Sequence, residues 1–513
     1  MKLAYLLSCL ALTSMTFADW PQWRGPERNG KAAAGLKIPV ISEDAPPAKL
    51  WESTSVPSDH DGGHGSVSVA KGKVYLSVVW HRDVPTEKRQ FTRKFLSDIG
   101  HRGTTGVPAE IVEKMEHDRM NLSRRLRGKE LDDYANQWVD DHIDEKTKLA
   151  LGSWIASRFK KGKAALPISA MEEVAAMSDH VFANQAELDA WFAERDWDDA
   201  VRDEIADKVL KTEKQANDVV LALDAETGEE AWRFEVEGFP SGRSSSSTPA
   251  VFDGKVYAAL SLNLYCIDAA TGEEIWQAPL TGKKGPASSP LITEGRVFLH
   301  ENRLTCFDAT TGAELWQNKQ VKGSNSSPAI WGNLILSNSS KELVAADIET
   351  GETLWAIPGG GDATPVVSGD YLILMSRFEK SNLSVYQLSA DGPEELWNHR
   401  YLARRYSASP IVHEGHVYHL GSSMHVCFDI ESGEKKWERP AQSQISSPVF
   451  VDGKLLVYEN KGGMLGMVEA RADDYHHMGK AKVGALPCAS PAIAGGKIFM
   501  RTKESVVCFQ LGE

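Results

Sequence analysis

The stretch Asp308-Ala309-Thr310-Thr311-Gly312-Ala313-Glu314-Leu315-Trp316 is one copy of a pattern, Asp-x-x-Thr-Gly-x-x-x-Trp, that recurs along this chain. The Asp and Trp pairs of the copies are Asp224 and Trp232, Asp268 and Trp276, Asp308 and Trp316, Asp347 and Trp355, and, with Ser in place of Thr, Asp429 and Trp437. The period is about 40 residues, which is the size of one four-stranded propeller blade.

The residue types of the pattern suit a tight hairpin and a packed outer strand. Asp308 can accept hydrogen bonds from backbone N–H groups two or three residues ahead, and Gly312 tolerates the positive φ that such a turn needs. Trp316 supplies a large flat body that can wedge against the neighbouring blade, so that the blades share a core. We therefore interpret these aspartates and tryptophans as structural.

Counting the units predicts the fold. A small residue before Pro begins seven units, and an altered start, Gly65-Ser66-Val67-Ser68, begins another. The seven steps are Thr248-Pro249, Ser289-Pro290, Ser327-Pro328, Thr364-Pro365, Ser409-Pro410, Ser447-Pro448 and Ser490-Pro491. The last unit runs out of chain before its outer strand, and we expect Lys49-Leu50-Trp51 to supply that strand and close the ring, because an open propeller exposes sheet edges. The prediction is an all-β, eight-bladed propeller.

These repeats resemble the pyrroloquinoline-quinone (PQQ) type of propeller repeat, found in quinoprotein alcohol dehydrogenases and in the propeller lipoprotein of the bacterial outer-membrane assembly machine. The resemblance covers residues from about 50 to the C-terminus apart from one insertion. It implies the fold, and it leaves the cofactor open because the family contains both quinone enzymes and a binding protein.

The remaining segments complete the domain prediction. Residues 1–18 read as a secretory signal, with Lys2, an apolar run and small residues before Asp19, so we expect an exported protein, periplasmic or extracellular. A lipoprotein signal using Cys9 is the alternative. Residues 19–49 are an N-terminal extension, and the propeller takes residues 50–82 and 217–513.

Residues 83–216 interrupt the first blade with helical rather than strand-like spacing. Ile111 and Met115, for example, are four residues apart, and Asn184 with Glu187 is a plausible helix cap. We expect an α-helical insertion on the face where the links enter the innermost strands, which we call the funnel face. It could be a lid, a docking platform for a partner, or a decoration.

Composition narrows the classes of function. The net charge of −14 argues against nucleic-acid binding, and beyond the leader no run of about 20 apolar residues could span a membrane. Four cysteines share one repeat position, Cys266, Cys306, Cys427 and Cys508, which predicts free thiols in a core. We expect a monomer.

Two groups of residues are candidate binding sites. The first is a set of basic residues just before innermost strands, which would focus a positive potential on the funnel face and hold an anionic small molecule or a protein partner: Arg243, Lys283, Lys284, Lys322, Arg404 and Arg405. The second is His60, Asp61 and His64 in a Gly-rich turn, which could bind zinc although their spacing matches no strong metal signature. Solvated loop charges and hydrogen-bonded loop histidines are the alternatives.

The resemblance implies a quinone site only in part. Quinoprotein dehydrogenases hold PQQ with calcium against a ring of two adjacent cysteines, and this chain has no adjacent cysteine pair and no Cys-x-x-Cys-His haem attachment. We therefore expect no catalytic residues and no cofactor. The leading hypothesis is an exported binding or scaffold protein that uses the funnel face. The alternatives are a PQQ-dependent dehydrogenase with an atypical site and an outer-membrane assembly factor.

Overall fold

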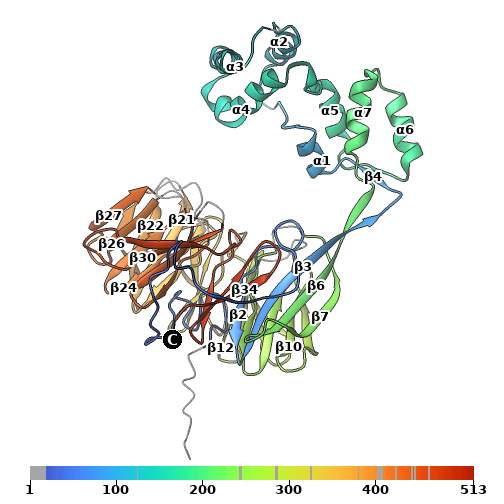
Figure 1. Cartoon of the computed structure of the whole chain (residues 1–513). Coiled ribbons are helices and arrows are strands. Elements are labelled where there is room, and N and C mark those ends of the chain that lie inside the picture. Colours follow the sequence, from blue (N-terminus) through green and yellow to red (C-terminus); the bar gives the residue numbers. More distant parts are fainter. Residues whose placement is uncertain are drawn as a thin grey trace, which may run out of the picture. The chain divides into compact units, whose positions relative to one another are not determined.

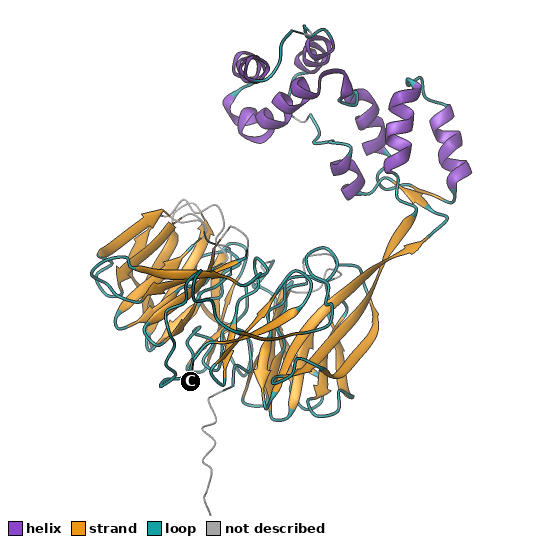
Figure 2. Cartoon of the chain, in the orientation of Figure 1, coloured by secondary structure: helices purple, strands orange, loops and turns teal. Residues whose placement is uncertain are grey.

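The chain folds into two compact units. The computed structural model describes residues 19–104, 106–123, 125–241, 245–282, 287–323, 326–378, 381–400, 408–421, 424–440, 443, 446–459 and 463–512. One unit, the propeller unit, contains residues up to Arg82 and from Gln215 onward, and the helical unit is Asp83–Lys214. Figures 1 and 2 show strands in the first and mostly helices in the second.

Within the described residues, the propeller unit contains eight four-stranded antiparallel sheets (Figure 1). The first four sheets, each written from its innermost strand outward, are β2 (Ser68–Ala70), β3 (Lys73–Pro85), β6 (Thr212–Asp224) and β7 (Glu230–Gly238); β8 (Ala250–Phe252), β9 (Lys255–Ala259), β10 (Asn263–Asp268) and β11 (Glu274–Pro279); β12 (Leu291–Thr293), β13 (Arg296–Glu301), β14 (Arg303–Asp308) and β15 (Glu314–Asn318); and β16 (Ala329–Trp331), β17 (Leu334–Asn338), β18 (Glu342–Asp347) and β19 (Thr353–Pro358).

The other four sheets repeat the same order. They are β20 (Val366–Ser368), β21 (Tyr371–Phe378), β22 (Ser381–Ser389) and β23 (Gly392–His399); β24 (Ile411–His413), β25 (His416–Leu420), β26 (Met424–Asp429) and β27 (Lys435–Pro440); β28 (Val449–Val451), β29 (Lys454–Glu459), β30 (Met464–Glu469) and β31 (His477–Lys482); and β32 (Ala492–Ala494), β33 (Lys497–Arg501) and β34 (Val506–Gln510) with β1 (Lys49–Glu52) as the outer strand.

The outer strand of the last sheet comes from the start of the chain, as expected from the sequence. β1 pairs antiparallel with β34, and Trp51 lies opposite Cys508. The indole of Trp51 donates a hydrogen bond of 3.0 Å to the carbonyl of Ala225, in the turn of the first sheet. The last sheet is therefore completed by residues that precede the first sheet, and β1 docks against that first sheet.

The hairpin turns form the hydrogen bonds that the pattern predicts. Oδ1 of Asp308 accepts from the backbone N–H of Thr310 at 2.9 Å and of Thr311 at 2.8 Å, and from the Thr311 hydroxyl at 2.9 Å. The hydrogen bonds from Thr311 hold the pKa of Asp308 below its ordinary value. The same turn recurs at Asp224, Asp268, Asp347 and Asp429.

Trp51, Trp232, Trp276 and Trp316 each dock on the turn glycine of the next sheet, and Trp437 docks on the carbonyl of Arg471 in a turn without glycine. A Cβ on Gly272 would come within 2.7 Å of the ring of Trp232, and the Trp232 indole donates to the carbonyl of Ala269 at 3.1 Å. Trp355 is the exception among the described contacts, because no indole hydrogen bond of this kind accompanies it. The sheet that follows Trp355 turns through a shorter hairpin at Gly392, so the docking carbonyl is missing.

The residues before the Pro steps join neighbouring sheets around the axis. In seven of the eight steps a backbone N–H donates to the Ser or Thr hydroxyl of the neighbouring sheet, over 2.8 to 3.2 Å. The donor and acceptor pairs are Ser66 to Thr248, Thr248 to Ser289, Ser289 to Ser327, Thr364 to Ser409, Ser409 to Ser447, Ser447 to Ser490 and Ser490 to Ser66. At the remaining step, the Ser326 hydroxyl donates to the carbonyl of Ala363 at 2.9 Å. Neighbouring sheets are thus connected all the way round.

The helical unit has its own core. Its elements are β4 (Arg89–Gln90), α1 (Arg93–Asp98), α2 (Ala109–Met120), α3 (Lys129–His142), α4 (Glu145–Lys161), η1 (Gly162–Ala164), α5 (Ile168–Ala176), β5 (Val181–Phe182), α6 (Gln185–Ala193) and α7 (Asp199–Lys208). Phe91, Phe159 and Trp138 are among its buried core residues. Asn184 caps α6 by accepting from the N–H of Glu187 at 3.1 Å, as the sequence predicted.

Two further expectations concern buried thiols and membranes. Cys266, Cys306, Cys427 and Cys508 are free and buried, as predicted. Throughout the described residues, no helix combines the length and the apolar character that crossing a bilayer requires.

Candidate functional site

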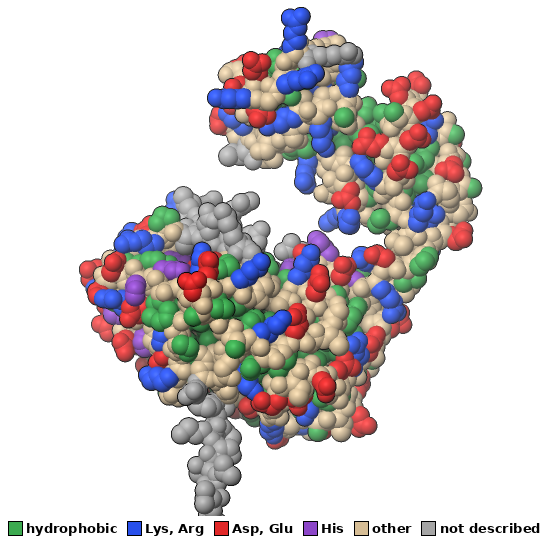
Figure 3. Space-filling model, in the orientation of Figure 1, with side chains coloured by type: hydrophobic (Ala, Val, Ile, Leu, Met, Phe, Trp, Pro, Cys, Tyr) green, Lys and Arg blue, Asp and Glu red, His purple; other side chains and the backbone are tan. Residues whose placement is uncertain are grey.

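Most of the basic residues predicted for the funnel face cannot be placed. Lys283, Lys284, Arg243, Arg404 and Arg405 lie outside the described residues. Lys322 is described and exposed, and its side chain makes no ion pair with the described residues. Elsewhere on the visible surface of the propeller unit, acidic and basic side chains are interspersed (Figure 3). The cluster of basic residues on the funnel face stays a prediction.

The histidines of the Gly-rich turn do not form a metal-binding group. His64 is buried, with its Nε2 at 3.7 Å from Oδ1 of Asp59, whereas His60 and Asp61 are exposed. Among the residues that the structure describes, no group of three or more His, Cys, Asp or Glu side chains is placed to hold a metal ion.

The histidines of the sixth sheet are packing residues. His419 is buried and neither ring nitrogen has a hydrogen-bond partner in the described chain, whereas His416 is partly exposed on the other face of β25. His425 lies 2.5 Å from the hydroxyl of Ser443 and 3.3 Å from that of Tyr475. Burial lowers the pKa of His419 and of His425 to about 4, so both rings are neutral at pH 7.

The N-terminal extension occupies the propeller axis, which the sequence did not predict. We call residues 20–32 the axial segment. Trp20 exchanges two backbone hydrogen bonds of 2.8 Å with Val69 of β2, and Phe450 of β28 donates to the carbonyl of Gly30 at 2.8 Å. The segment therefore pairs with innermost strands of the first and the seventh sheets.

Two arginines of the axial segment are buried on backbone carbonyls. Arg24 donates to the carbonyls of Ser409 at 3.0 Å and Pro410 at 2.6 Å, and Arg28 donates to the carbonyl of Pro290 at 2.9 Å. Their exposed fractions are 3% and 7%, and neither pairs with a carboxylate among the described residues. Burial lowers the pKa of each guanidinium to about 9, so both remain charged at pH 7.

The space beside the axial segment is uneven. A pocket of about 330 Å³ lies beside Glu27, Asn29 and Lys31, against the innermost strands of the fourth, fifth and sixth sheets, whereas the region around Trp23 and Arg24 is tightly packed. The Trp23 indole donates to the hydroxyl of Thr364 at 2.9 Å. A void of about 10 Å³ lies between Trp20, Trp23, Arg24 and the starts of the first, seventh and eighth innermost strands. That is room for about one water molecule. At this level the axis is a packed core that links the third, fifth and sixth sheets through side chains.

The helical unit contains a groove of about 850 Å³. Its walls are α2, the segment 163–169 that leads into α5, and the first half of α7, and we call it the α2–α5–α7 groove. The apolar lining includes Val107, Val112, Met120, Leu166, Ile168 and Val201. The charged lining consists of Glu113, Glu116, Arg119, Lys163, Asp198 and Glu204. A cavity of this size, with an apolar lining and a few polar groups, is typical of a binding site.

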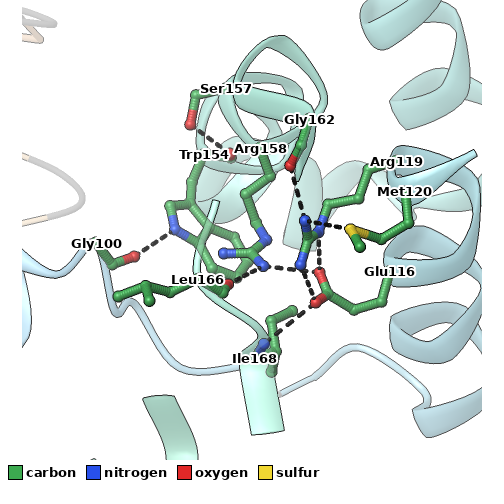
Figure 4. A network of polar contacts seen from close by, with 10 residues as sticks. All are labelled: Gly100, Glu116, Arg119, Met120, Trp154, Ser157, Arg158, Gly162, Leu166 and Ile168. Carbon is green, nitrogen blue, oxygen red and sulfur yellow. Dashed lines mark hydrogen bonds and ion pairs between the residues drawn. The ribbon is translucent and has the colours of Figure 1, made fainter. Parts of the chain in front are cut away.

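A charged network holds the floor of the groove together (Figure 4). The Glu116 carboxylate accepts from Nε and Nη2 of Arg119, at 2.6 and 2.5 Å, and from Nη2 of Arg158 at 2.7 Å. It also accepts from the backbone N–H of Ile168 at 3.2 Å, at the start of α5. Arg119 reaches further, to the carbonyl of Gly162 at 2.8 Å. One carboxylate thus ties α2, α4 and α5 together.

The Glu116 carboxylate stays ionised at neutral pH. Burial alone would raise the pKa of Glu116, but the hydrogen bonds and charges of Arg119 and Arg158 outweigh it and lower the pKa. Arg119 and Arg158 are 2% and 4% exposed. Because a buried charge is costly unless it is paired and hydrogen-bonded, removing one partner would leave the others uncompensated. The network is therefore a rigid floor rather than a set of free charges.

Both sites were missed from the sequence for identifiable reasons. The axial segment carried one signal, two tryptophans and two arginines in a Gly- and Pro-containing stretch, Trp20-Pro21-Gln22-Trp23-Arg24-Gly25-Pro26-Glu27-Arg28, which suits packing better than a linker. No sequence signal marked the groove, because its lining residues are far apart in sequence and follow no repeat.

The sequence matches a family model described as outer membrane protein assembly factor BamB. The two matches cover residues 216–400 and 300–472, which together span about half of the chain. No curated protein matches the chain significantly.

Several solved structures resemble part of the chain. BamB from Moraxella catarrhalis is 18% identical, with a TM-score of 0.47 over 56% of this chain and 87% of that one. A europium-containing methanol dehydrogenase is 13% identical, with a TM-score of 0.44 over 57% and 81%. A quinohemoprotein alcohol dehydrogenase from Comamonas testosteroni is 13% identical, with a TM-score of 0.43 over 58% and 72%.

Proposed function

We propose that this chain, which belongs to the family described as outer membrane protein assembly factor BamB, is an exported protein that acts by binding and not by catalysis. The observation that supports this proposal is the axial segment. It fills one end of the propeller axis with the chain's own side chains, which is a packing arrangement suited to a rigid frame. Propellers host many unrelated activities, so the site and not the fold must decide between them.

A quinone does not fit the void beside Arg24. Sites for organic cofactors are typically several hundred Å³ in volume, whereas the void beside Arg24 is about 10 Å³. The donor groups there are already engaged, because Arg24 and Arg28 bind backbone carbonyls. We therefore derive no catalytic step through PQQ and calcium, and the dehydrogenase alternative is less well supported.

We infer that the eight sheets are the blades of one closed ring with the helical unit inserted in the first blade. The hydroxyl hydrogen bonds around the axis and the pairing of β1 with β34 support this inference. In such a ring the axial segment blocks the end of the axis away from the links. The funnel face is then the end at which a protein partner or an anionic molecule would bind, and its cations would be Lys322 and the five basic residues named with it.

The funnel face can be tested with an acidic probe. We expect the triple variant Lys322→Ala/Arg404→Ala/Arg405→Ala to bind a fluorescein-labelled polyglutamate peptide about tenfold more weakly at low salt and to show a flatter salt dependence. The matched control is Lys435→Ala/Lys436→Ala/Arg439→Ala, which removes three cations from the outer strand β27. Equal binding by the wild type, the triple variant and the control would remove the funnel-face proposal.

A separate titration tests binding against catalysis. The purified protein is titrated with PQQ and calcium, and reduction of a dye is followed with alcohols and sugars. We expect no stoichiometric quinone binding and no reduction. Tight one-to-one binding with substrate-dependent dye reduction would overturn the proposal in favour of a dehydrogenase.

A further inference from the structure

The α2–α5–α7 groove carries an uneven charge. Its lining contains four carboxylates, Glu113, Glu116, Asp198 and Glu204, and two cations, Arg119 and Lys163. The guanidinium of Arg119 already forms an ion pair with Glu116 in the floor network. The acidic side of the groove therefore faces solvent with little basic compensation.

Two of the carboxylates are available to a ligand. Glu113 and Asp198 are exposed, and neither forms an ion pair within the described part of the chain. Asp198 precedes α7, but its side chain makes no capping hydrogen bond. Glu204, in contrast, pairs with Lys208 at 2.8 Å. Glu113 and Asp198 thus offer two free negative charges on opposite walls, one on α2 and one at α7.

The apolar lining between these charges is accessible. Met120 is 42% exposed, which is high for such a side chain, and Val112 and Val201 are partly exposed on α2 and α7. Methionine adapts its shape easily and is common at surfaces that bind varied apolar side chains. The floor below is fixed by Glu116, which holds α2 against the start of α5, so the groove exists without a ligand.

We propose that the α2–α5–α7 groove binds an amphipathic helix of a partner protein that carries Lys or Arg beside its apolar stripe. Binding of a helix in a groove between helices uses apolar residues spaced three and four apart, with charges beside them that set specificity. The free carboxylates on two walls complement basic flanking residues. An anionic lipid would meet the unpaired carboxylates of Glu113 and Asp198 and is disfavoured, although its acyl chain would suit the apolar lining.

This inference does not depend on the funnel face. The two sites lie in different units and are predicted to prefer ligands of opposite charge, because the funnel-face cations would select an acidic partner. Loss of one binding activity therefore leaves the other measurable.

The test uses three helical peptides that share a leucine stripe at helical spacing and differ only in their flanking residues, which are Lys, Gln or Glu. Fluorescence anisotropy with the full-length mature protein measures each affinity. We expect the affinity to fall from the Lys peptide to the Gln peptide to the Glu peptide, with at least about a tenfold difference between the Lys and Glu peptides at low salt. We expect Glu113→Lys/Asp198→Lys to reverse this order.

A matched control separates the groove from the general charge of the helical unit. Glu110→Lys/Asp203→Lys makes the same charge change on exposed positions of α2 and α7 that do not line the groove, and it should keep the wild-type order. Val201→Asp places a charge in the apolar lining and should weaken all three peptides, while thermal unfolding checks that it folds.

Three outcomes would overturn the proposal. One is an unchanged order of affinities in Glu113→Lys/Asp198→Lys, and another is the same reversal in the control variant. The third is binding of phosphatidylglycerol vesicles that Val201→Asp abolishes in a protein that binds no peptide, since the groove would then be a lipid site.

Discussion

At the scale of single residues, buried polar side chains without partners are the most informative feature of the propeller unit. His419 lies fully inside the sixth sheet with no hydrogen bond from the described chain to either ring nitrogen. Burying such an unpaired polar group destabilises the folded protein, because no hydrogen bond compensates for the water it loses. It also resists protonation, since burial lowers its pKa from 6.5 to about 4.

His419 should make the stability of the protein depend on pH. The unfolded imidazole takes up a proton near pH 6.5 and the folded one only near pH 4, so the unfolded state binds more protons between these values. Stability is therefore full above pH 6.5 and falls as the pH drops toward 4, with a contribution of about 2 kcal/mol lost at pH 5. We expect His419→Leu to remove this part of the loss and to keep or increase stability at pH 7.

Urea unfolding of the wild type and His419→Leu at pH 7 and pH 5 measures this effect. His416→Leu in the same strand is the control, because His416 is partly exposed and lies on the other face. A variant with the full wild-type loss between pH 7 and pH 5 would contradict the assignment.

At the scale of elements, the blades are joined by one contact repeated with small variations. A tryptophan on an outer strand covers the turn glycine of the next sheet and donates its indole N–H to a carbonyl of that turn. The contact made by Trp51 is special because β1 reaches it from the opposite end of the chain. It therefore joins the first sheet to the sheet that β1 completes.

Substitution of the turn glycine should show how much this contact contributes to stability. In Gly228→Ala the new Cβ would lie within 2.5 Å of the Trp51 ring, in addition to the strain of a residue with φ of 76°. Gly254→Ala has nearly the same φ, 73°, but no atom within 4 Å of the added carbon. We expect about 1 kcal/mol of destabilisation for Gly254→Ala and about 2 kcal/mol more for Gly228→Ala. Equal losses in urea unfolding would mean that Trp51 does not restrain the first sheet.

At the scale of the whole molecule, the axial segment joins sheets that are distant along the chain. Its backbone pairs with the first and seventh sheets, and its side chains bind carbonyls or hydroxyls of the third, fifth and sixth. In a repeat protein each unit otherwise contacts only its neighbours. The segment therefore adds contacts across the axis, and its removal should weaken the propeller unit as a whole.

We expect a mature protein that lacks residues 19–32 to melt at least several degrees lower, because it loses several buried side chains worth a few kcal/mol in total. A synthetic peptide of residues 19–32 added in trans should restore part of the loss. A peptide with Ala in place of Arg24 and Arg28 should restore less, because the carbonyls that they bind would stay unpaired. An unchanged melting temperature in the truncated protein would show that the segment is dispensable.

How much of this fold the sequence predicts depends on how far apart in sequence the interacting residues are. The hairpin at Asp308 uses donors two and three residues ahead, so its chemistry is legible in the sequence. The pairing of β1 with β34 was also predictable, because one unit lacked a strand and Lys49-Leu50-Trp51 could supply it. The role of the Ser and Thr residues before Pro was not predicted, since their hydrogen bonds join neighbouring sheets, 41 and 38 residues apart at Thr248 and Ser289 and 424 residues apart between Ser490 and Ser66.

The sequence by itself determined the repeat, its turns, the docking tryptophans, the helical character of the residues between β3 and β6 and the acidic composition, because each rests on local chemistry or on composition. Only the tertiary structure decided which residues lie in the axis and where the helical unit forms the α2–α5–α7 groove. Arg24 binds a carbonyl 385 positions away along the chain, and the walls of the α2–α5–α7 groove come from three separate stretches. No pattern in sequence marks such contacts, because they depend on how complete elements pack and not on the residues beside them.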